Sequence, residues 1–176
     1  MEIRAERLLL REFTESDLDA LHAYHSDPRY GEFYVPEELT AEHTRKLLNL
    51  FLGWAEEDPR RGCQVAITLA DELIGTCGVR KSVWDGTDAE FGIELNPEHW
   101  GQGYAEEAAR AILGRGFTEL GVAIMRGQSV SRNEGAARLV RKLGFVSIGM
   151  RKGPPWMQSR GWQVQDWELA RAAWSG

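Results

Sequence analysis

The sequence lacks the residues that mark several classes of protein. Only two of its 176 residues are cysteines, Cys63 and Cys77, and they do not form a Cys-x-x-Cys pair. This excludes a disulfide framework, and each thiol is predicted to be buried in a reducing compartment. No apolar run reaches membrane-spanning length, and residues 1–7 are too charged for a signal peptide. We therefore expect a cytoplasmic protein with no membrane partner.

Positive charge is also scarce. Lys and Arg total 21 against 27 Asp and Glu, giving a formal net charge of -6. A general nucleic-acid binder needs excess positive charge, so a cationic small molecule or basic peptide suits this chain better. Among the four histidines, His22 and His25 are spaced to share a helix face. Because no cluster of Cys or Glu accompanies them, no metal site is expected.

The order of the predicted elements indicates one mixed α/β or α+β domain spanning residues 1–176. Alternation with period two predicts strands, and apolar residues at helical spacing predict helices. Residues 30–38 and 151–160 are predicted to be loops. The expected strands are residues 8–13, 64–69, 73–79, 89–95, 123–130, 145–150 and 163–169, and the expected helices are residues 14–25, 40–57, 105–117 and 131–143.

A glycine loop between a strand and a helix is the most informative feature. Gly101 and Gly103 allow the backbone to approach an anion closely, and the N-terminal N–H groups and dipole of the following helix attract negative charge. No Lys-Ser or Lys-Thr pair follows, as a P-loop requires, and the loop comes too late in the chain for an ordinary dinucleotide-binding unit. The pattern predicts a phosphate cradle, with a ligand-free tight turn as the alternative.

A second motif lies in residues 131–145. Combined with the glycine loop, it resembles the GNAT superfamily of N-acetyltransferases, and within it the branch that contains ribosomal-protein N-terminal acetyltransferases. The resemblance covers nearly the whole chain. It implies a mostly antiparallel central sheet with one splayed parallel strand pair and flanking helices. The motifs that carry it are Trp100-Gly101-Gln102-Gly103-Tyr104-Ala105, Asn133-Glu134-Gly135-Ala136 and Lys142-Leu143-Gly144-Phe145.

The resemblance implies that acetyl-CoA is the cosubstrate and binds between the strands at residues 90–95 and 123–130. Pantetheine would bond to the backbone of the first strand, and the pyrophosphate would meet N–H groups of the glycine loop. Asn133 matches the family's cofactor-side asparagine, with helix capping as its alternative role. The implied cofactor-binding residues are Ile93, Glu94, Leu95, Gln102, Gly103, Tyr104, Ala105, Glu106 and Asn133.

The resemblance also implies direct attack of an amine on the thioester. Glu90 and Glu94 share one face of the strand beside the expected thioester, so we predict Glu90 as general base, with Glu94 second. The alternative is that both are solvent-facing or ion-paired. The tyrosine and serine that act as acids in relatives fall at Val140 and Ala136. A thiol with a pKa of about 8.5 leaves without strong acid help, so their absence leaves the reaction feasible.

The predicted function is acetyl transfer to a primary amine, either a protein N-terminus or a small molecule. The alternative is a noncatalytic acyl-CoA-binding regulatory domain. The resemblance alone implies a homodimer. Aromatic residues occur in segments that the family uses around the acceptor cleft, and packing is the alternative role of each: Tyr30, Phe33, Tyr34, Trp84, Trp156 and Trp162.

Overall fold

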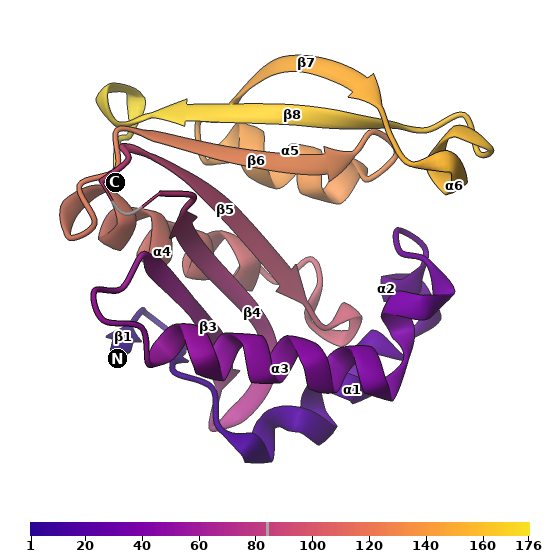
Figure 1. Ribbon diagram of the computed structural model, residues 1–176, viewed down its shortest axis with the longest axis horizontal. Coiled ribbons are helices and arrows are strands. Elements are labelled where there is room, and N and C mark those ends of the chain that lie inside the picture. The colour runs from indigo at the N-terminus through magenta and orange to yellow at the C-terminus, as the bar shows by residue number, and fades with distance from the viewer. Residues whose placement is uncertain (84) are drawn as a thin grey trace.

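A computed structural model describes residues 1–83 and 85–176 of the chain (Figure 1). In the described part, eight strands form one sheet in the order β1-β2-β3-β4-β5-β6-β8-β7. Every neighbouring pair is antiparallel except β5 and β6, which are parallel. The predicted mixed sheet is confirmed. The strands are β1 (Glu2–Arg4), β2 (Leu9–Arg11), β3 (Gly62–Leu69), β4 (Glu72–Lys81), β5 (Asp88–Leu95), β6 (Ile124–Val130), β7 (Val146–Lys152) and β8 (Gln163–Ala170).

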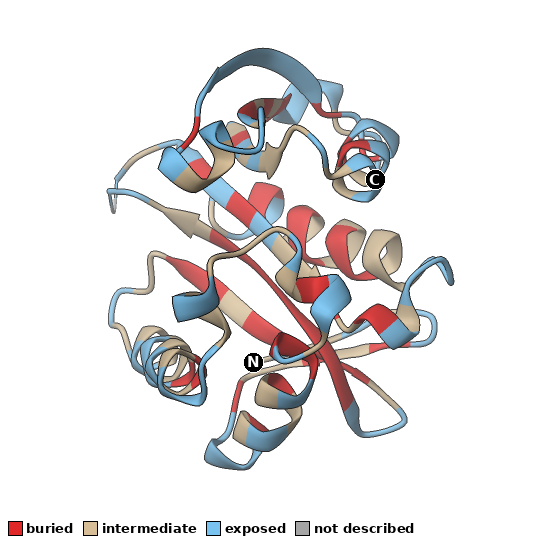
Figure 2. Cartoon of the chain, turned by 90° about the vertical axis from the view of Figure 1, so that its right-hand side faces the viewer, coloured by how far each residue is buried: buried red, intermediate tan, exposed pale blue. Residues whose placement is uncertain are grey.

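Helices cover both faces of the sheet. In Figure 1, α1 and α3 lie in front of the sheet and α4 lies behind it. One buried apolar cluster joins the sheet to α4 and α5, and a second joins it to α1 and α3. Figure 2 shows the buried residues concentrated along the central strands and the inner side of the helices. The helices are α1 (Leu18–His25), α2 (Pro28–Gly31), α3 (Ala41–Ala55), α4 (Tyr104–Thr118), α5 (Glu134–Lys142) and α6 (Pro155–Gln158).

The alternating sequence of strand β5 explains which of its two faces packs against α4. Ala89, Phe91 and Leu95 are buried and belong to the same cluster as the apolar face of α4, whereas Glu90 and Gly92 are exposed. Successive side chains of a strand point to opposite faces, so this alternation fixes which face meets α4. The acidic side chains of β5 consequently lie on the face opposite α4.

The parallel pairing of β5 and β6 is short. It comprises Asp88 with Ile124, Ala89 with Met125 and Glu90 with Arg126. β6 instead pairs with β8 over seven residue pairs, and β4 pairs with β5 as far as Leu95. The two parallel strands therefore splay apart after Glu90, and within the described residues one edge of the second half of β5 has no strand partner.

Strand β7 is an edge of the sheet, and all seven of its residues are exposed. Three of them are large and apolar: Val146, Ile148 and Met150, which are 61%, 50% and 57% exposed. Its pairing with β8 shifts register between Ser147 and Gly149. No helix in the described part of the chain is long and apolar enough to cross a membrane.

Three short elements were missing from the sequence prediction. Strand β1 pairs with β2 although its residues are mostly charged. The one-turn helix α2 (Pro28–Gly31) extends into the predicted loop 30–38, and the one-turn helix α6 lies within the predicted loop 151–160. The side chain of Asp27 caps α2 by accepting from the Arg29 N–H at 2.8 Å, so the Asp27-Pro28 pair that ends α1 also begins α2.

The predicted start of the helix after β6 was also wrong. Residues 131–143 were expected to be helical with Ser131 as the cap, but α5 begins at Glu134. Asn133 is its N-cap, and its Oδ1 accepts from the Ala136 N–H at 2.9 Å. Ser131 instead accepts from the Gln163 N–H of β8 at 3.0 Å through its hydroxyl oxygen. Asn133 therefore has the capping role that the sequence left as an alternative.

Candidate active site

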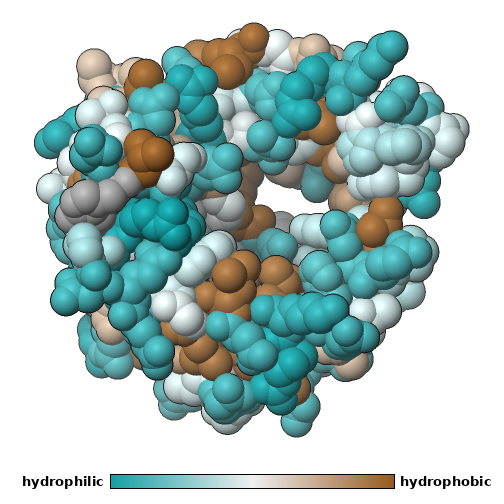
Figure 3. Space-filling model, viewed as in Figure 1, coloured by the Kyte–Doolittle hydropathy of each residue, from teal (hydrophilic) through white to brown (hydrophobic). Residues whose placement is uncertain are grey.

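A cleft of about 640 Å³ lies where β5 and β6 separate. Its walls come from β5, the glycine loop, the first turns of α4 and α5, and the segment that contains α2. Figure 3 shows the surface hollowed between the part of the molecule that contains β3 and β4 and the part that contains β6 and β8. Every residue predicted to bind the cofactor lines this cleft except Gln102.

The glycine loop has the backbone geometry of an anion site. Gly101 and Gly103 have φ angles of 75° and 85°, in the left-handed region that favours glycine, and Gly103 is the N-cap of α4. Within the described chain, the backbone N–H groups of residues 102–106 have no backbone acceptor. Free N–H groups at a helix start suit a phosphate, so the loop fits the pyrophosphate of CoA.

Arg7 supports this loop, although no sequence pattern had indicated a role for it. Its Nη1 donates to the Gln102 carbonyl at 3.0 Å, and its guanidinium lies 4.4 Å from the centre of the Tyr104 ring. The Glu107 carboxylate accepts from Arg7 Nε at 2.8 Å and from the Leu8 N–H at 3.1 Å. These contacts tie the loop to the chain leading into β2 and place a positive charge beside it.

Glu106 also lies in the first turn of α4, where a carboxylate would oppose a bound phosphate. It pairs with Lys142 of α5 at 2.5 Å and with Arg110 at 3.2 Å. The hydrogen bond from Lys142, opposed by some burial and assisted by Arg110, lowers the pKa of Glu106. The negative charge of Glu106 is therefore neutralised by Arg110 and Lys142, and Lys142 links the start of α4 to α5.

The open edge of β5 offers backbone groups to a ligand. The Asn96 N–H donates to the Ile74 carbonyl of β4 at 2.8 Å. Since backbone groups alternate between the two edges of a strand, those of Ile93 and Leu95 face the side away from β4. The Leu95 carbonyl accepts from the Trp100 indole N–H at 2.9 Å. Ile93 is therefore the residue whose backbone groups are most available to an extended ligand.

Glu94 points into a cluster of aromatic side chains, and its own side chain is 26% exposed. Its oxygens lie 3.3 Å from the Tyr34 hydroxyl, 3.5 Å from the Tyr24 hydroxyl and 3.4 Å from His25 Nε2. Among the described residues, no Lys or Arg lies within 4.0 Å of this carboxylate. The carboxylate is therefore surrounded by hydrogen-bond donors but lacks a permanent cation.

The tyrosines of this cluster remain donors. Burial, and after it the negative charge of Glu94, raises the pKa of Tyr24 and of Tyr34 above the usual value for a phenol. Tyr30 stacks on Tyr34 with ring centres 4.4 Å apart, and its pKa is raised for the same two reasons. All three phenols are therefore protonated at neutral pH.

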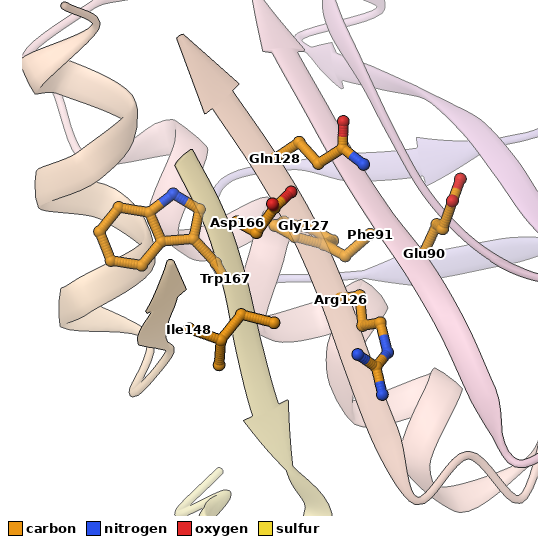
Figure 4. Close-up of a pocket in the computed structure, with 8 residues that line it drawn as sticks. All are labelled: Glu90, Phe91, Arg126, Gly127, Gln128, Ile148, Asp166 and Trp167. Carbon is orange, nitrogen blue, oxygen red and sulfur yellow. The ribbon is translucent and has the colours of Figure 1, made fainter. Parts of the chain in front are cut away.

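Glu90 lies away from the glycine loop. It is exposed and lines a separate cavity of about 560 Å³ with residues of β6, β7 and β8. Figure 4 shows its carboxylate pointing away from the guanidinium of Arg126 on the adjacent strand. Arg126 pairs instead with Asp88 at 3.0 Å and Glu168 at 3.3 Å. The structure thus brings Glu94, but not Glu90, together with the predicted cofactor residues.

The predicted aromatic residues divide into two groups. Tyr30, Phe33 and Tyr34 line the cleft. Trp162 lies beside them, with its ring centre 6.1 Å from that of Phe33 and 6.3 Å from that of Trp156. Trp84 lies outside the described residues. In the described ranges, no group of three or more His, Cys, Asp or Glu side chains could hold a metal ion.

Comparisons with known proteins agree with this architecture. The GNAT acetyltransferase domain family matches residues 7–146. YoaA of Bacillus subtilis, an uncharacterised N-acetyltransferase, is 31% identical over 84% of each chain. A GNAT-family acetyltransferase from Bacillus anthracis is 29% identical, with a TM-score of 0.79 and coverage of 97% of this chain and 98% of that one.

The fold is also that of RimL, a ribosomal L7/L12 α-N-protein acetyltransferase solved with coenzyme A. The TM-score is 0.84 at 18% identity, over 98% of this chain and 99% of RimL. Family match, sequence identity and fold agree over most of the chain. The protein therefore belongs to the GNAT family of acetyl-CoA-dependent N-acetyltransferases.

Proposed function

We propose that the protein transfers the acetyl group of acetyl-CoA to a primary amine, with Glu94 as the residue that receives the amine's proton. The observation that carries this proposal is the placement of the Glu94 carboxylate. It lines the same cleft as the glycine loop and has no Lys or Arg partner among the described residues. A half-buried carboxylate without a permanent cation can attract an ammonium group and accept its proton, directly or through water.

The cofactor residues are proposed from the same geometry. The N–H groups of Gln102, Gly103, Tyr104, Ala105 and Glu106 would receive the pyrophosphate, and the backbone of Ile93 would bond to pantetheine. Because the Leu95 carbonyl is already bonded to Trp100, Leu95 would contribute its N–H group or apolar contact. Asn133 would shape the cleft by capping α5.

The chemistry requires few groups. The neutral amine nitrogen attacks the acetyl carbon, the C–N bond forms, and the C–S bond breaks as the CoA thiolate leaves. The ammonium form loses one proton to Glu94 before the attack, and this proton passes to solvent; the amine nitrogen then loses a second proton by the same route after the C–N bond has formed. Val140 is buried in the core and Ala136 has no polar side chain, so neither can protonate the thiolate. A leaving thiolate with a pKa of about 8.5 needs little protonation at neutral pH.

The identity of the acceptor amine, the oligomeric state and the cellular location of the protein are further proposals. An α-amine such as a protein N-terminus, with a pKa of about 8, or another weakly basic amine is favoured, because it needs less help from a base than a lysine-like amine with a pKa of about 10.4. Homodimer formation and a cytoplasmic location remain predictions.

The test compares Glu94→Gln with Glu90→Gln. Wild-type protein is screened with acetyl-CoA against N-terminal peptides, aminoglycosides, polyamines and amino acids, and release of the CoA thiol is measured. We expect kcat to fall by about 100-fold in Glu94→Gln, as for loss of a general base, and little in Glu90→Gln. The reverse order would assign the base to Glu90. No thiol release by the wild type with any amine would refute the transferase function.

A further inference from the structure

His25 is a buried histidine that joins three elements around Glu94. It is the last residue of α1 and is 2% exposed. Its Nδ1 lies 3.1 Å from the Thr44 hydroxyl of α3, and its Nε2 lies 3.4 Å from Glu94 Oε2 of β5. The ring stacks on Tyr30 at 4.8 Å and meets Tyr24 edge-on at 4.6 Å. These contacts hold the ring so that each nitrogen faces one fixed partner.

The partners select one tautomer of His25. A neutral imidazole has one N–H donor and one lone pair, and an ionised carboxylate can only accept. The Thr40 carbonyl already accepts from the Thr44 N–H at 3.0 Å. The Thr44 hydroxyl lies 3.2 Å from the same carbonyl, to which it can also donate, and 3.1 Å from Nδ1. Because Nε2 faces the Glu94 carboxylate and so carries the proton, Nδ1 presents its lone pair, and the Thr44 hydroxyl is the donor that can reach it. In the assigned arrangement, Nδ1 accepts from Thr44 and Nε2–H donates to Glu94.

We infer that His25 is a positioning residue for Glu94 and that the hydroxyl of Thr44 holds His25 in the tautomer required for this. The inference rests on the proposed role of Glu94. Oε2 of Glu94 faces both His25 and Tyr24, while Oε1 faces Tyr34. Donors on both oxygens fix the rotation of the carboxylate toward the cleft. A displacement of even 1 Å of a reacting group can cost about 100-fold in rate.

Thr44 offers a matched pair of variants because it is completely buried and belongs to a different helix from His25. Thr44→Val keeps the shape of the side chain and removes the hydroxyl, whereas Thr44→Ser keeps the hydroxyl and removes the methyl group. Only Thr44→Val deprives Nδ1 of its donor. A defect specific to this variant would therefore act through the imidazole.

The tautomer can be tested without any activity. The imidazole ¹⁵N spectrum contains four histidines, and the signals lost in His25→Gln identify His25. In the wild type and in Thr44→Ser, we expect a protonated Nε2 and an unprotonated Nδ1. In Thr44→Val, we expect the proton to move partly or wholly to Nδ1. A wild-type spectrum with Nδ1 protonated, or an unchanged tautomer in Thr44→Val, would overturn the inference.

Kinetics test the consequence for Glu94. With the amine that the wild type acetylates fastest, we expect kcat to fall about tenfold in Thr44→Val and about 100-fold in His25→Leu. Thr44→Ser should remain near wild type, and His25→Gln, whose amide can donate, should recover part of the loss. The affinity for acetyl-CoA, measured by calorimetry, should stay unchanged in all four variants.

The outcomes separate the two proposals. Equal kcat in folded Thr44→Val and Thr44→Ser would refute the positioning role and leave the transferase function standing. A wild type that releases no CoA thiol with any amine would refute the proposed function, and the ¹⁵N spectra would still decide whether His25 donates to Glu94.

Discussion

At the scale of single residues, two glycines determine what the loop before α4 can hold. Gly101 and Gly103 both adopt left-handed backbone angles, and a Cβ added at Gly101 would have no atom of the described residues within 4 Å. A methyl group there would thus avoid the described protein atoms and would stand in the cleft that Gly101 lines. The local cost of a substitution is therefore limited to backbone strain, while the cost to a ligand is steric.

Gly101→Ala should weaken acetyl-CoA binding by at least tenfold, because the methyl group enters the space that the pyrophosphate approaches. Gly121→Ala is a matched control, since Gly121 has a φ of 62°, a Cβ added there would have no described atom within 4 Å, and Gly121 is not among the residues that line the cleft. Both variants should lose about 1 kcal/mol of stability through left-handed strain. Calorimetry and thermal unfolding measure the two effects, and equal affinities for the two variants would contradict the cradle assignment.

The sequence predicted the residues of the site only where the signal is local. The glycine loop follows a strand and precedes a helix within a few residues, so its geometry could be predicted. The surroundings of Glu94 could not, since Tyr24 and His25 reach it from 70 and 69 residues away. For the same reason Arg7, which supports the loop from 95 residues away, gave no signal. Period-two alternation predicted that Glu90 and Glu94 share one face of the strand, but it could not predict that they line different cavities.

At the scale of elements, the end of α3 is attached to β4 through Glu57. Its carboxylate accepts from Arg61 at 3.1 Å and also from Arg80, whose guanidinium lies 4.1 Å from the centre of the Trp54 ring. The hydrogen bonds from Arg80 and then Arg61 lower the pKa of Glu57 to about 2 from its usual 4.5. α3 covers the sheet beside the cleft and supplies Thr44. The attachment of its end to β4 therefore helps to hold Thr44 in place near Glu94.

The attachment predicts a pH dependence of stability. A carboxyl group with a lowered folded-state pKa stabilises the fold above its unfolded pKa, and that contribution is lost as pH falls. For Glu57 the loss runs between pH 4.5 and about 2. Glu57→Gln should cost about 1 kcal/mol at neutral pH, because the group is partly solvated, and should flatten the pH curve in this window.

Denaturant unfolding across this pH range measures the effect. Glu42→Gln in the first turn of α3 is the control, because the Glu42–Lys46 pair is strongly exposed and should contribute little. Parallel pH curves for the wild type and Glu57→Gln would contradict the assignment of the acid sensitivity to Glu57.

Longer elements could be predicted from the sequence, and short ones could not. The hairpin of β3 and β4, the strand β5 and the helices α3 and α4 each show several repeats of their own period. The elements β1, α2 and α6 have only three or four residues. At that length a periodicity is not detectable, and pairing with β2 or a cap at Asp27 decides the structure. The start of α5 was misplaced because Ser131 and Asn133 are both good caps by residue type.

At the scale of the whole molecule, the described chain forms two parts that share one sheet and one apolar cluster, but the two parts of the sheet pair over only three residue pairs between β5 and β6. The cleft lies where β5 and β6 would otherwise continue to pair. A cofactor bound there would contact β5 and α4 on one side and α5 on the other. Binding should therefore stabilise the molecule as a unit and not only its loop.

Acetyl-CoA at 100 times its Kd should raise the free energy of unfolding by about 2.7 kcal/mol, provided that it binds only the folded protein. Thermal unfolding with and without acetyl-CoA measures this. Hydrogen exchange should also slow at the backbone amides of Ile93 and Leu95, on the open edge of β5. Absence of both effects at saturating acetyl-CoA would contradict the proposed binding site.

The exposed edge strand β7 has a consequence for behaviour in concentrated solution. An unpaired edge bearing Val146, Ile148 and Met150 is a template for intermolecular strand pairing, and such pairing can grow into aggregates. Two features of the strand oppose this outcome. The register shift next to Gly149 interrupts the flat edge, and the exposed Lys152 places a positive charge where a second edge would approach, while Arg151 pairs with Asp166 at 3.0 Å. We therefore expect charge repulsion at Lys152 to oppose edge-to-edge pairing of β7, and added salt to weaken this opposition.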